Sequence, residues 1–133
     1  MTVPTPSQWY HLTNAFTGPH VALDVVNDNG TASSGVLQMA FSGNFSGQYW
    51  QLTPYPSPSS STYALFTLFL GANKRLDVYG NDATKPNLAD AGNFSGQIWT
   101  ISPWGDGTWM LWNQYSGSRL HLDVYSDTKT VHG

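Results

Sequence analysis

Three aspartates occupy the same local context in this chain. Asp24, Asp77 and Asp123 each stand between a leucine and a valine, in the triplet Leu-Asp-Val. Side chains alternate between the two faces of a β-strand, so we expect the leucine and valine in the core and the carboxylate pointing away from it. A carboxylate accepts hydrogen bonds through two oxygens and donates none. We interpret three equivalent carboxylates as a repeated binding feature; the alternative is a structural aspartate that accepts turn amides.

Other reactive side chains show no recognisable catalytic arrangement. The four histidines lack metal-ligand spacing, and the chain has no cysteine. It contains neither a Gly-x-Ser-x-Gly elbow nor a phosphate-binding loop. Paired acids such as Asp24 and Asp28 could suggest a glycosidase, but one carboxylate on each of three repeats is typical of binding. The sequence therefore predicts a protein that is not an enzyme and needs neither metal nor cofactor.

The repeats are defined by a seven-residue motif, Asn-Phe-Ser-Gly-Gln-x-Trp. It occupies residues 44–50 and returns 49 positions later at residues 93–99. Together with the triplets it predicts three repeats, at about 8–55, 63–104 and 108–133. Gln48 follows Asp24 by 24 residues and Gln97 follows Asp77 by 20, so a third glutamine would fall near positions 143–147. We therefore expect the third repeat to be truncated.

Size and charge narrow the classes of partner. A length of 133 residues fits one domain, residues 1–133. Five basic residues and a net charge of −3 provide no positive patch for nucleic acid or an anionic membrane. Residues 1–7 do not form a secretory signal, and the apolar run at 63–70 is too short to insert into a membrane. We expect a cytoplasmic protein and leave a non-classical secretion route open.

Short β-branched and aromatic runs alternate with turns rich in glycine, asparagine, serine and proline. This punctuation, every 8–12 residues and without an amphipathic helix, is typical of an all-β barrel or sandwich. Residues 54–62 read as a connector inside the domain. The expected strands are 9–14, 21–26, 36–41 and 48–53, then 63–70, 75–79, 87–91 and 97–102, then 108–113 and 120–125.

Leu-Asp-Val early and Gln-x-Trp late in each repeat resemble the ricin B-chain type of β-trefoil lectin, in a cysteine-free, fungal-like form. The resemblance implies three four-stranded repeats around a pseudo-threefold axis. Two strands of each repeat would form a six-stranded barrel, of which the sixth would be absent here. Trp50 and Trp99 would fill the core.

The resemblance also implies a sugar site in each repeat, with the aspartate accepting hydrogen bonds from sugar hydroxyls. The aromatic platform of such sites falls on Ala40 and Ala89, so Phe41, Tyr79 or Tyr125 would have to supply a ring. Bonds to the turn backbone explain the glutamines of the motif better than sugar contact does, and turn capping is the alternative for its asparagines. The candidate sugar-binding residues are Asp24, Gln38, Asn44, Gln48, Asp77, Asn87, Asn93, Gln97 and Asp123.

These residues predict a lectin for galactose-type or related glycans or glycoconjugates, with the first and second sites best supplied. One alternative is a trefoil protease inhibitor or protein-interaction scaffold that works through the loops 54–62 and 103–107. Another is a carbohydrate-binding module detached from a glycoside hydrolase. An incomplete barrel would leave an unpaired edge, so we expect a partner chain, the N-terminal arm or a swapped segment to cover it, with a homodimer as one form.

Overall fold

The computed structural model describes residues 5–26, 35–124 and 131–132. The first repeat contributes β1 (Val21–Val25), β2 (Leu37–Phe41) and β3 (Trp50–Pro54). The second contributes β4 (Tyr63–Thr67), β5 (Lys74–Tyr79), β6 (Asp82–Asp90) and β7 (Trp99–Pro103), and the third β8 (Trp109–Asn113), β9 (Asp123–Val124) and β10 (Val131–His132). The helical turns η1 (Ser46–Gln48) and η2 (Ser95–Gln97) precede β3 and β7, and none of the helices described could cross a membrane.

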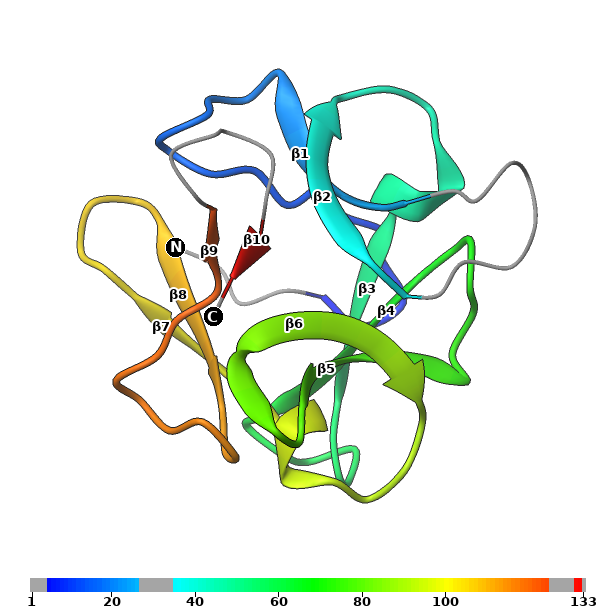
Figure 1. The fold of residues 1–133 in the computed structure, drawn as a ribbon, viewed down its shortest axis with the longest axis vertical. Coiled ribbons are helices and arrows are strands. Elements are labelled where there is room, and N and C mark those ends of the chain that lie inside the picture. Colours follow the sequence, from blue (N-terminus) through cyan, green and yellow to red (C-terminus); the bar gives the residue numbers. More distant parts are fainter. Residues whose placement is uncertain (1–4, 27–34, 125–130, 133) are drawn as a thin grey trace.

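Two kinds of strand pairing organise these elements. A four-stranded sheet runs in the order β3-β4-β7-β8, and every pair in it is antiparallel. Three separate hairpins, β1–β2, β5–β6 and β9–β10, lie around the centre of the molecule, one for each repeat (Figure 1). The all-β expectation is confirmed.

The segment 9–14 belongs to the four-stranded sheet although it makes a single bridge. Tyr10 and Trp50 exchange backbone hydrogen bonds at 2.8 and 2.9 Å. Tyr63 of β4 pairs with Trp99 in the same way. The barrel therefore has five contributing segments in the part of the chain that is described, in the order 9–14, β3, β4, β7, β8.

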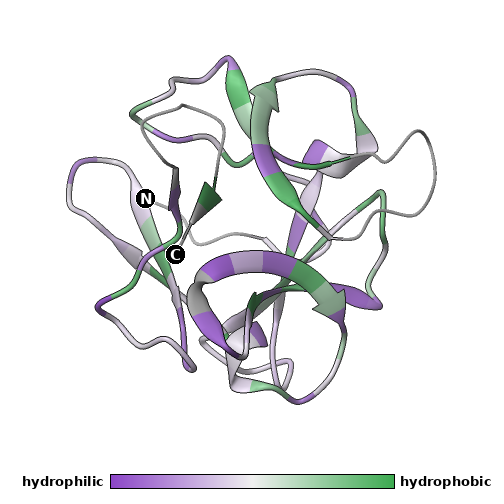
Figure 2. Ribbon diagram, in the orientation of Figure 1, coloured by the Kyte–Doolittle hydropathy of each residue, from purple (hydrophilic) through white to green (hydrophobic). Residues whose placement is uncertain are grey.

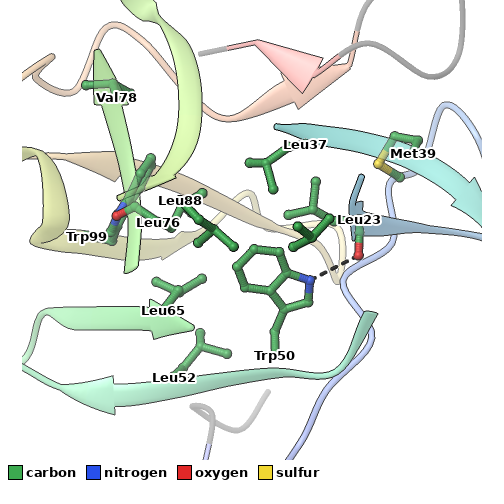
Figure 3. Packing of buried hydrophobic residues seen from close by; sticks show 11 residues of the cluster. Leu23, Leu37, Met39, Trp50, Leu52, Leu65, Leu76, Val78, Leu88 and Trp99 are labelled. Carbon is green, nitrogen blue, oxygen red and sulfur yellow. Dashed lines mark hydrogen bonds between the residues drawn. The ribbon is translucent and has the colours of Figure 1, made fainter. Parts of the chain in front are cut away.

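The two motif tryptophans fill the centre of the core. Trp50 is fully buried and Trp99 is 2% exposed. Leucines surround Trp50, and its indole Nε1 donates to the Leu23 carbonyl at 3.0 Å (Figure 3). Trp99 donates to Leu76 at the same distance. The core role expected for both rings is confirmed, and each ring ties its barrel strand to the hairpin of its own repeat.

The residues that flank the first two aspartates also lie as expected, whereas Leu122 of the third triplet is only half-buried. Leu23, Val25, Leu76 and Val78 are buried. Along β2, a hydrophilic residue separates hydrophobic neighbours (Figure 2), as the two-residue period of a strand requires when only one face is buried. The hairpins therefore carry their polar residues on the face that is turned away from the core.

Several strand boundaries differ from the sequence-based expectation. β4 ends at Thr67 and not at residue 70, and β9 begins at Asp123 and not at residue 120. Gln48 and Gln97 end three-residue helical turns and do not begin strands. β6 begins at Asp82, five residues before the expected 87, because it continues the β5 hairpin through a register shift at Val78 and Tyr79. The segment 9–14 forms a bridge and no regular strand. Tyr125, expected at the end of a strand, lies outside the described residues.

Candidate functional site

Asp24 lies in the middle of β1, directly opposite Gln38 on β2. The Gln38 side-chain Nε2 donates to Asp24 Oδ2 at 3.1 Å. This cross-strand bond fixes the carboxylate on the outer face of the hairpin, where the two-residue period places it. The strand pairing thus brings together two residues that the sequence analysis assigned to one site.

A shallow cavity of about 340 Å³ opens beside this carboxylate. Its walls come from three places in the chain: β1, the segment around η1, and the turn after β4. They combine one carboxylate, one side-chain amide, one hydroxyl and two aromatic rings. The lining residues are Asp24, Val25, Asn44, Phe45, Ser46, Gly47 and Phe69.

The surroundings of Asp24 favour its neutral form more than water does. Desolvation by burial raises the pKa of the Asp24 carboxyl above its usual value, and the hydrogen bonds from Gln38, the Val25 backbone and Gln48 oppose this only in part. A half-buried acceptor beside an open cavity gains from a ligand that donates hydrogen bonds to it. Hydroxyl groups are such donors.

The tight approach of η1 to Asp24 depends on a glycine. A Cβ on Gly47 would lie 2.9 Å from Asp24 Oδ1. In the second repeat, a Cβ on Gly96 would lie 2.2 Å from Asp77 Oδ1. The glycine of the motif therefore gives the carboxylate space, which explains why it immediately precedes the buried glutamine in both copies.

The aromatic walls of this cavity were not among the residues singled out from sequence. Phe45 is 59% exposed, and its counterpart Phe94 is 58% exposed. Each ring lies against a glycine, because a Cβ on Gly43 or Gly92 would lie within 2.5 Å of the ring of Phe45 or Phe94, respectively. The repeated motif could have identified these rings. Its phenylalanine recurs between an asparagine and a serine, where a buried core residue is not expected, so it was a candidate for the aromatic platform of the sugar site.

Asn44 lies at the cavity with an exposed side chain. Its Oδ1 accepts a hydrogen bond from the Tyr49 hydroxyl, so its amide nitrogen is the group suited to donate to a ligand. Tyr49 is itself packed against the ring of His11, with 5.0 Å between the ring centroids. The structure thus places Asp24 and Asn44 at one cavity, whereas Gln38 contacts Asp24 without lining the cavity.

The two motif glutamines have a backbone role. Gln48 and Gln97 are fully buried. Gln48 Oε1 accepts from the Gly43 amide at 3.0 Å and its Nε2 donates to the Phe41 carbonyl at 2.9 Å. Gln97 bonds in the same way to Gly92 and Asp90. Direct ligand contact by either glutamine is incompatible with this burial, so both hold the turn that shapes the site.

The second repeat holds its aspartate through a different set of contacts. Asp77 Oδ1 accepts from the Val78 amide at 2.8 Å, and Oδ2 accepts from Gln97 Nε2 at 3.1 Å. Asn87 lies opposite Asp77 in the strand register, and its Oδ1 is buried without a hydrogen-bond partner. Asn93 is exposed next to Phe94. The parts of the first site recur here, but the motif glutamine and not the cross-strand amide donates to the carboxylate.

The positions expected to carry the aromatic platform are half-buried in both repeats. Ala40 pairs with Ala22 across the first hairpin, and Ala89 pairs with Arg75 across the second. The Arg75 guanidinium lies over the Tyr55 ring at 4.4 Å from its centroid. Phe41 and Tyr79, two of the rings expected to replace the aromatic platform, are 82% and 41% exposed. Neither ring lines the cavity beside Asp24. Tyr125, the third such ring, lies outside the described residues.

The third aspartate has different neighbours. Asp123 is exposed on β9 and pairs in the strand register with His132 of β10. It lies at a larger cavity together with Trp104 and His121, whose rings meet edge to face at 5.7 Å. No glutamine or asparagine of the Gln-x-Trp motif accompanies it in the part of the chain that is described. The first and second repeats therefore carry more of the candidate residues than the third does.

Comparison with known proteins identifies the architecture. No protein-family model matches the sequence, and no curated protein matches it. Among solved structures, the designed three-fold symmetric protein ThreeFoil superposes with a TM-score of 0.73 at 25% identity, over 89% of this chain and 79% of that one. Together with the three hairpins and the shared barrel, this similarity shows that the chain is an all-β protein with the β-trefoil fold.

Proposed function

We propose that this β-trefoil is a lectin that binds galactose-type or related glycans, with its main site at the Asp24 cavity. One observation carries the proposal: a half-buried carboxylate, an exposed amide and an exposed aromatic ring line the same shallow cavity. A sugar offers donor hydroxyls on its edge and apolar C–H groups on its face. Asp24 suits the hydroxyls and Phe45 suits the face.

The Asp77 region serves as a second site in this proposal. It repeats the carboxylate, the exposed asparagine and the exposed phenylalanine. Because the small cavity described lies beside Asp24, we expect stronger binding there than at Asp77. Binding at both sites needs neither a metal nor a catalytic step.

A direct test compares two paired variants on a glycan array and by titration calorimetry with galactose and lactose. Removing a charged acceptor costs about 1.5–3 kcal/mol, so Asp24→Asn/Asp77→Asn should bind at least about tenfold more weakly. Asp106→Asn, which alters an exposed carboxylate bonded to Thr108, is the matched control and should bind like the wild type. If the wild type binds no glycan, the proposal is wrong.

A specific feature favours protease inhibition as the second candidate function. The connector 54–62 is exposed at its tip but braced at both ends: Thr62 Oγ1 donates to the Tyr55 carbonyl at 2.6 Å, and the Tyr55 hydroxyl donates to the Gly92 carbonyl at 3.0 Å. A preorganised loop is what a substrate-like inhibitor presents. Inhibition of a protease panel by the wild type, abolished by Ser59→Pro and retained in Asp24→Asn/Asp77→Asn, would favour this function.

A further inference from the structure

The second hairpin carries a positive charge at a position where the first hairpin has none. Arg75 lies on β5 two residues before Asp77, and burial alternates along this part of the strand, so both side chains belong to its outer face. Two residues of an extended strand span about 7 Å, which places the arginine next to the aspartate. The equivalent residue of the first hairpin is Ala22, which is fully buried. Of the two proposed glycan sites, the second therefore has a cation beside its carboxylate.

An aromatic ring supports this cation. The Arg75 Cζ lies 4.4 Å from the centroid of the Tyr55 ring. The Tyr55 hydroxyl donates to the Gly92 carbonyl at 3.0 Å, and the Gly92 amide donates to Gln97 Oε1 at 3.1 Å. Gln97 Nε2 in turn donates to Asp77 Oδ2. The ring under the guanidinium is thus tied, through the motif turn, to the aspartate, and this chain of contacts holds the two charged groups in a fixed relation.

The guanidinium of Arg75 has no carboxylate partner among the described residues. The two lysines of the same hairpin, by contrast, are paired with carboxylates at 2.6 and 3.9 Å. Stacking on a ring occupies the face of a guanidinium and leaves the N–H groups along its edge. Arg75 is half-buried, and its neighbour across the hairpin is Ala89, which adds only a methyl group beside it. The edge of the guanidinium is therefore available to an anionic group of a ligand.

The third repeat contains the same arrangement with different residues. His121 lies two residues before Asp123, and its ring meets that of Trp104 edge to face at 5.7 Å. Tyr55 and Trp104 are equivalent, because each follows a barrel strand and donates its backbone amide to a threonine carbonyl at 3.0 Å. A nitrogen-bearing side chain against this aromatic position is therefore a feature of the repeat and not a chance contact on β5.

We propose that the Asp77 site prefers galactose-type glycans that carry an acidic substituent, a carboxylate or a sulfate, and that Arg75 binds this substituent. The inference rests on the proposed lectin function. Asp77 accepts from hydroxyl groups of the sugar, and Arg75 donates to the anionic oxygens through two N–H groups of its planar edge. The Asp24 site, with Ala22 at the equivalent position, binds neutral glycans. The two sites of one chain thus differ in specificity.

The test uses the Asp24→Asn variant, in which the second site dominates binding. Titration calorimetry at low ionic strength compares lactose with lactose that carries either sialic acid or a sulfate group on its galactose. At least one acidic glycan should bind at least about threefold more tightly than lactose, because a charge-assisted hydrogen bond is added. This preference should shrink at about 1 M salt, where the Debye length is about 3 Å.

Substitutions of Arg75 in the Asp24→Asn variant test its part in the preference. Arg75→Gln should reduce the ratio of the affinities for the acidic glycan and for lactose to about one, because the remaining contacts are shared by both ligands. Arg75→Lys keeps the charge but loses the planar pair of N–H groups, so it should retain part of the preference. Melting temperatures show whether each variant is folded.

The matched control is Arg119→Gln, which removes the same charge from an exposed position. It should keep the ratio of the Asp24→Asn variant. If Arg119→Gln lowers the ratio as much as Arg75→Gln does, net charge and not Arg75 sets the preference, and the inference is wrong.

The results also separate this inference from the proposed function. If the wild type binds lactose and the Asp24→Asn variant binds neither acidic glycan more tightly than lactose, the inference fails while the lectin proposal stands. Preference for one acidic glycan alone would support the inference and identify the substituent. If neither lactose nor an acidic glycan binds the wild type, both proposals fail.

Discussion

Asp24 and Asp77 hold the same place in their repeats, but their carboxylates are engaged differently. Asp24 Oδ2 accepts from Gln38, the residue across the hairpin. Asp77 Oδ2 accepts from Gln97, the glutamine of the motif turn, and the Asn87 Oδ1 opposite Asp77 has no partner. A single difference in the cross-strand residue, glutamine or asparagine, thus changes how the carboxylate is held, because the shorter amide does not form the cross-strand bond.

The raised pKa of Asp24 leads to a prediction about pH. The carboxyl protonates at a higher pH than an exposed aspartate, so glycan binding at this site should weaken at a higher pH than an ordinary aspartate would give. The ionised form destabilises the folded chain, and this cost disappears as the pH falls through the raised pKa. Acidification through this pKa should therefore reduce binding while it removes the cost of this carboxylate to folding.

The measurement is the affinity for lactose against pH in wild type and Asp24→Asn. We expect the wild-type profile to fall on the acid side and the variant's weaker binding to stay flat over the same range. The melting temperature of Asp24→Asn near neutral pH should equal or exceed that of the wild type, because the variant has no buried charge. A large drop in its melting temperature would assign Asp24 a structural role.

Phe45 is the proposed stacking surface, and Phe41 is its competitor. Loss of a stacked ring costs about 0.5–1.5 kcal/mol beyond the area it buries, so Phe45→Ala should weaken lactose binding by about two- to tenfold. Because the ring is 59% exposed, the free energy of unfolding should change little. Phe41→Ala, on a ring that is 82% exposed, is the matched control. If Phe41→Ala alone weakens binding, the platform is Phe41.

At the scale of elements, the motif turn and the aspartate hairpin depend on each other through a glycine. In the second repeat, the Asp77 carboxylate occupies the space that a side chain on Gly96 would need, with only 2.2 Å to the added Cβ. The Val78 amide and Gln97 hold that carboxylate in place, so it does not swing away freely. The element η2 can approach β5 only with glycine at this position.

We predict that Gly96→Ala destabilises the chain by about 1–3 kcal/mol, as overpacking does elsewhere. Denaturant unfolding measures the change. Gly80→Ala is the matched control, because no atom lies within 4 Å of its added Cβ. Adding Asp77→Ala to Gly96→Ala should restore part of the lost free energy of unfolding, because the carboxylate that the new methyl group meets is then removed. If the effects of the two substitutions on the free energy of unfolding simply add, Gly96 and Asp77 are not in contact.

At the scale of the whole molecule, the trefoil places the two proposed glycan sites on different hairpins. β1–β2 carries the first site and β5–β6 the second, and Figure 1 shows these hairpins apart from each other around the centre. Two weak sites on one rigid body bind a surface that displays many sugars more tightly than either site binds a single sugar. The arrangement therefore supports cross-linking of glycan-coated surfaces.

A protein with two glycan sites should cross-link lactose-coated beads, which a protein with one site cannot do. The wild type should aggregate lactose-coated beads, and either Asp24→Asn or Asp77→Asn alone should abolish aggregation while one site still binds free lactose. Light scattering follows the beads, and calorimetry counts the sites. Asp123→Asn, at the third aspartate, should aggregate the beads as the wild type does. Aggregation by both single-site variants would show that the third repeat contributes a working site.

Much of the core and of the repeat order could be predicted from the chain alone. The positions of Trp50, Trp99 and the Leu-Asp-Val triplets follow from residue type and two-residue periodicity, which are local properties. The same periodicity placed Asp24 opposite the core face, and the strand pairing then brought Gln38 to it. The start of β6 was missed because a hairpin can continue through turn-like residues when a register shift accommodates them.

The tertiary structure decided which of the repeated polar residues can meet a ligand. Gln48 and Gln97 are buried because their helical turns fold back against the hairpins, and no local pattern distinguishes that position from an exposed one. Phe45 and Asp24 meet across 21 residues of chain, through packing that sequence spacing does not specify. Sequence alone determined the repeat and its core, because hydrophobic periodicity is local. Only the fold determined the cavity beside Asp24, because this cavity forms where distant segments converge.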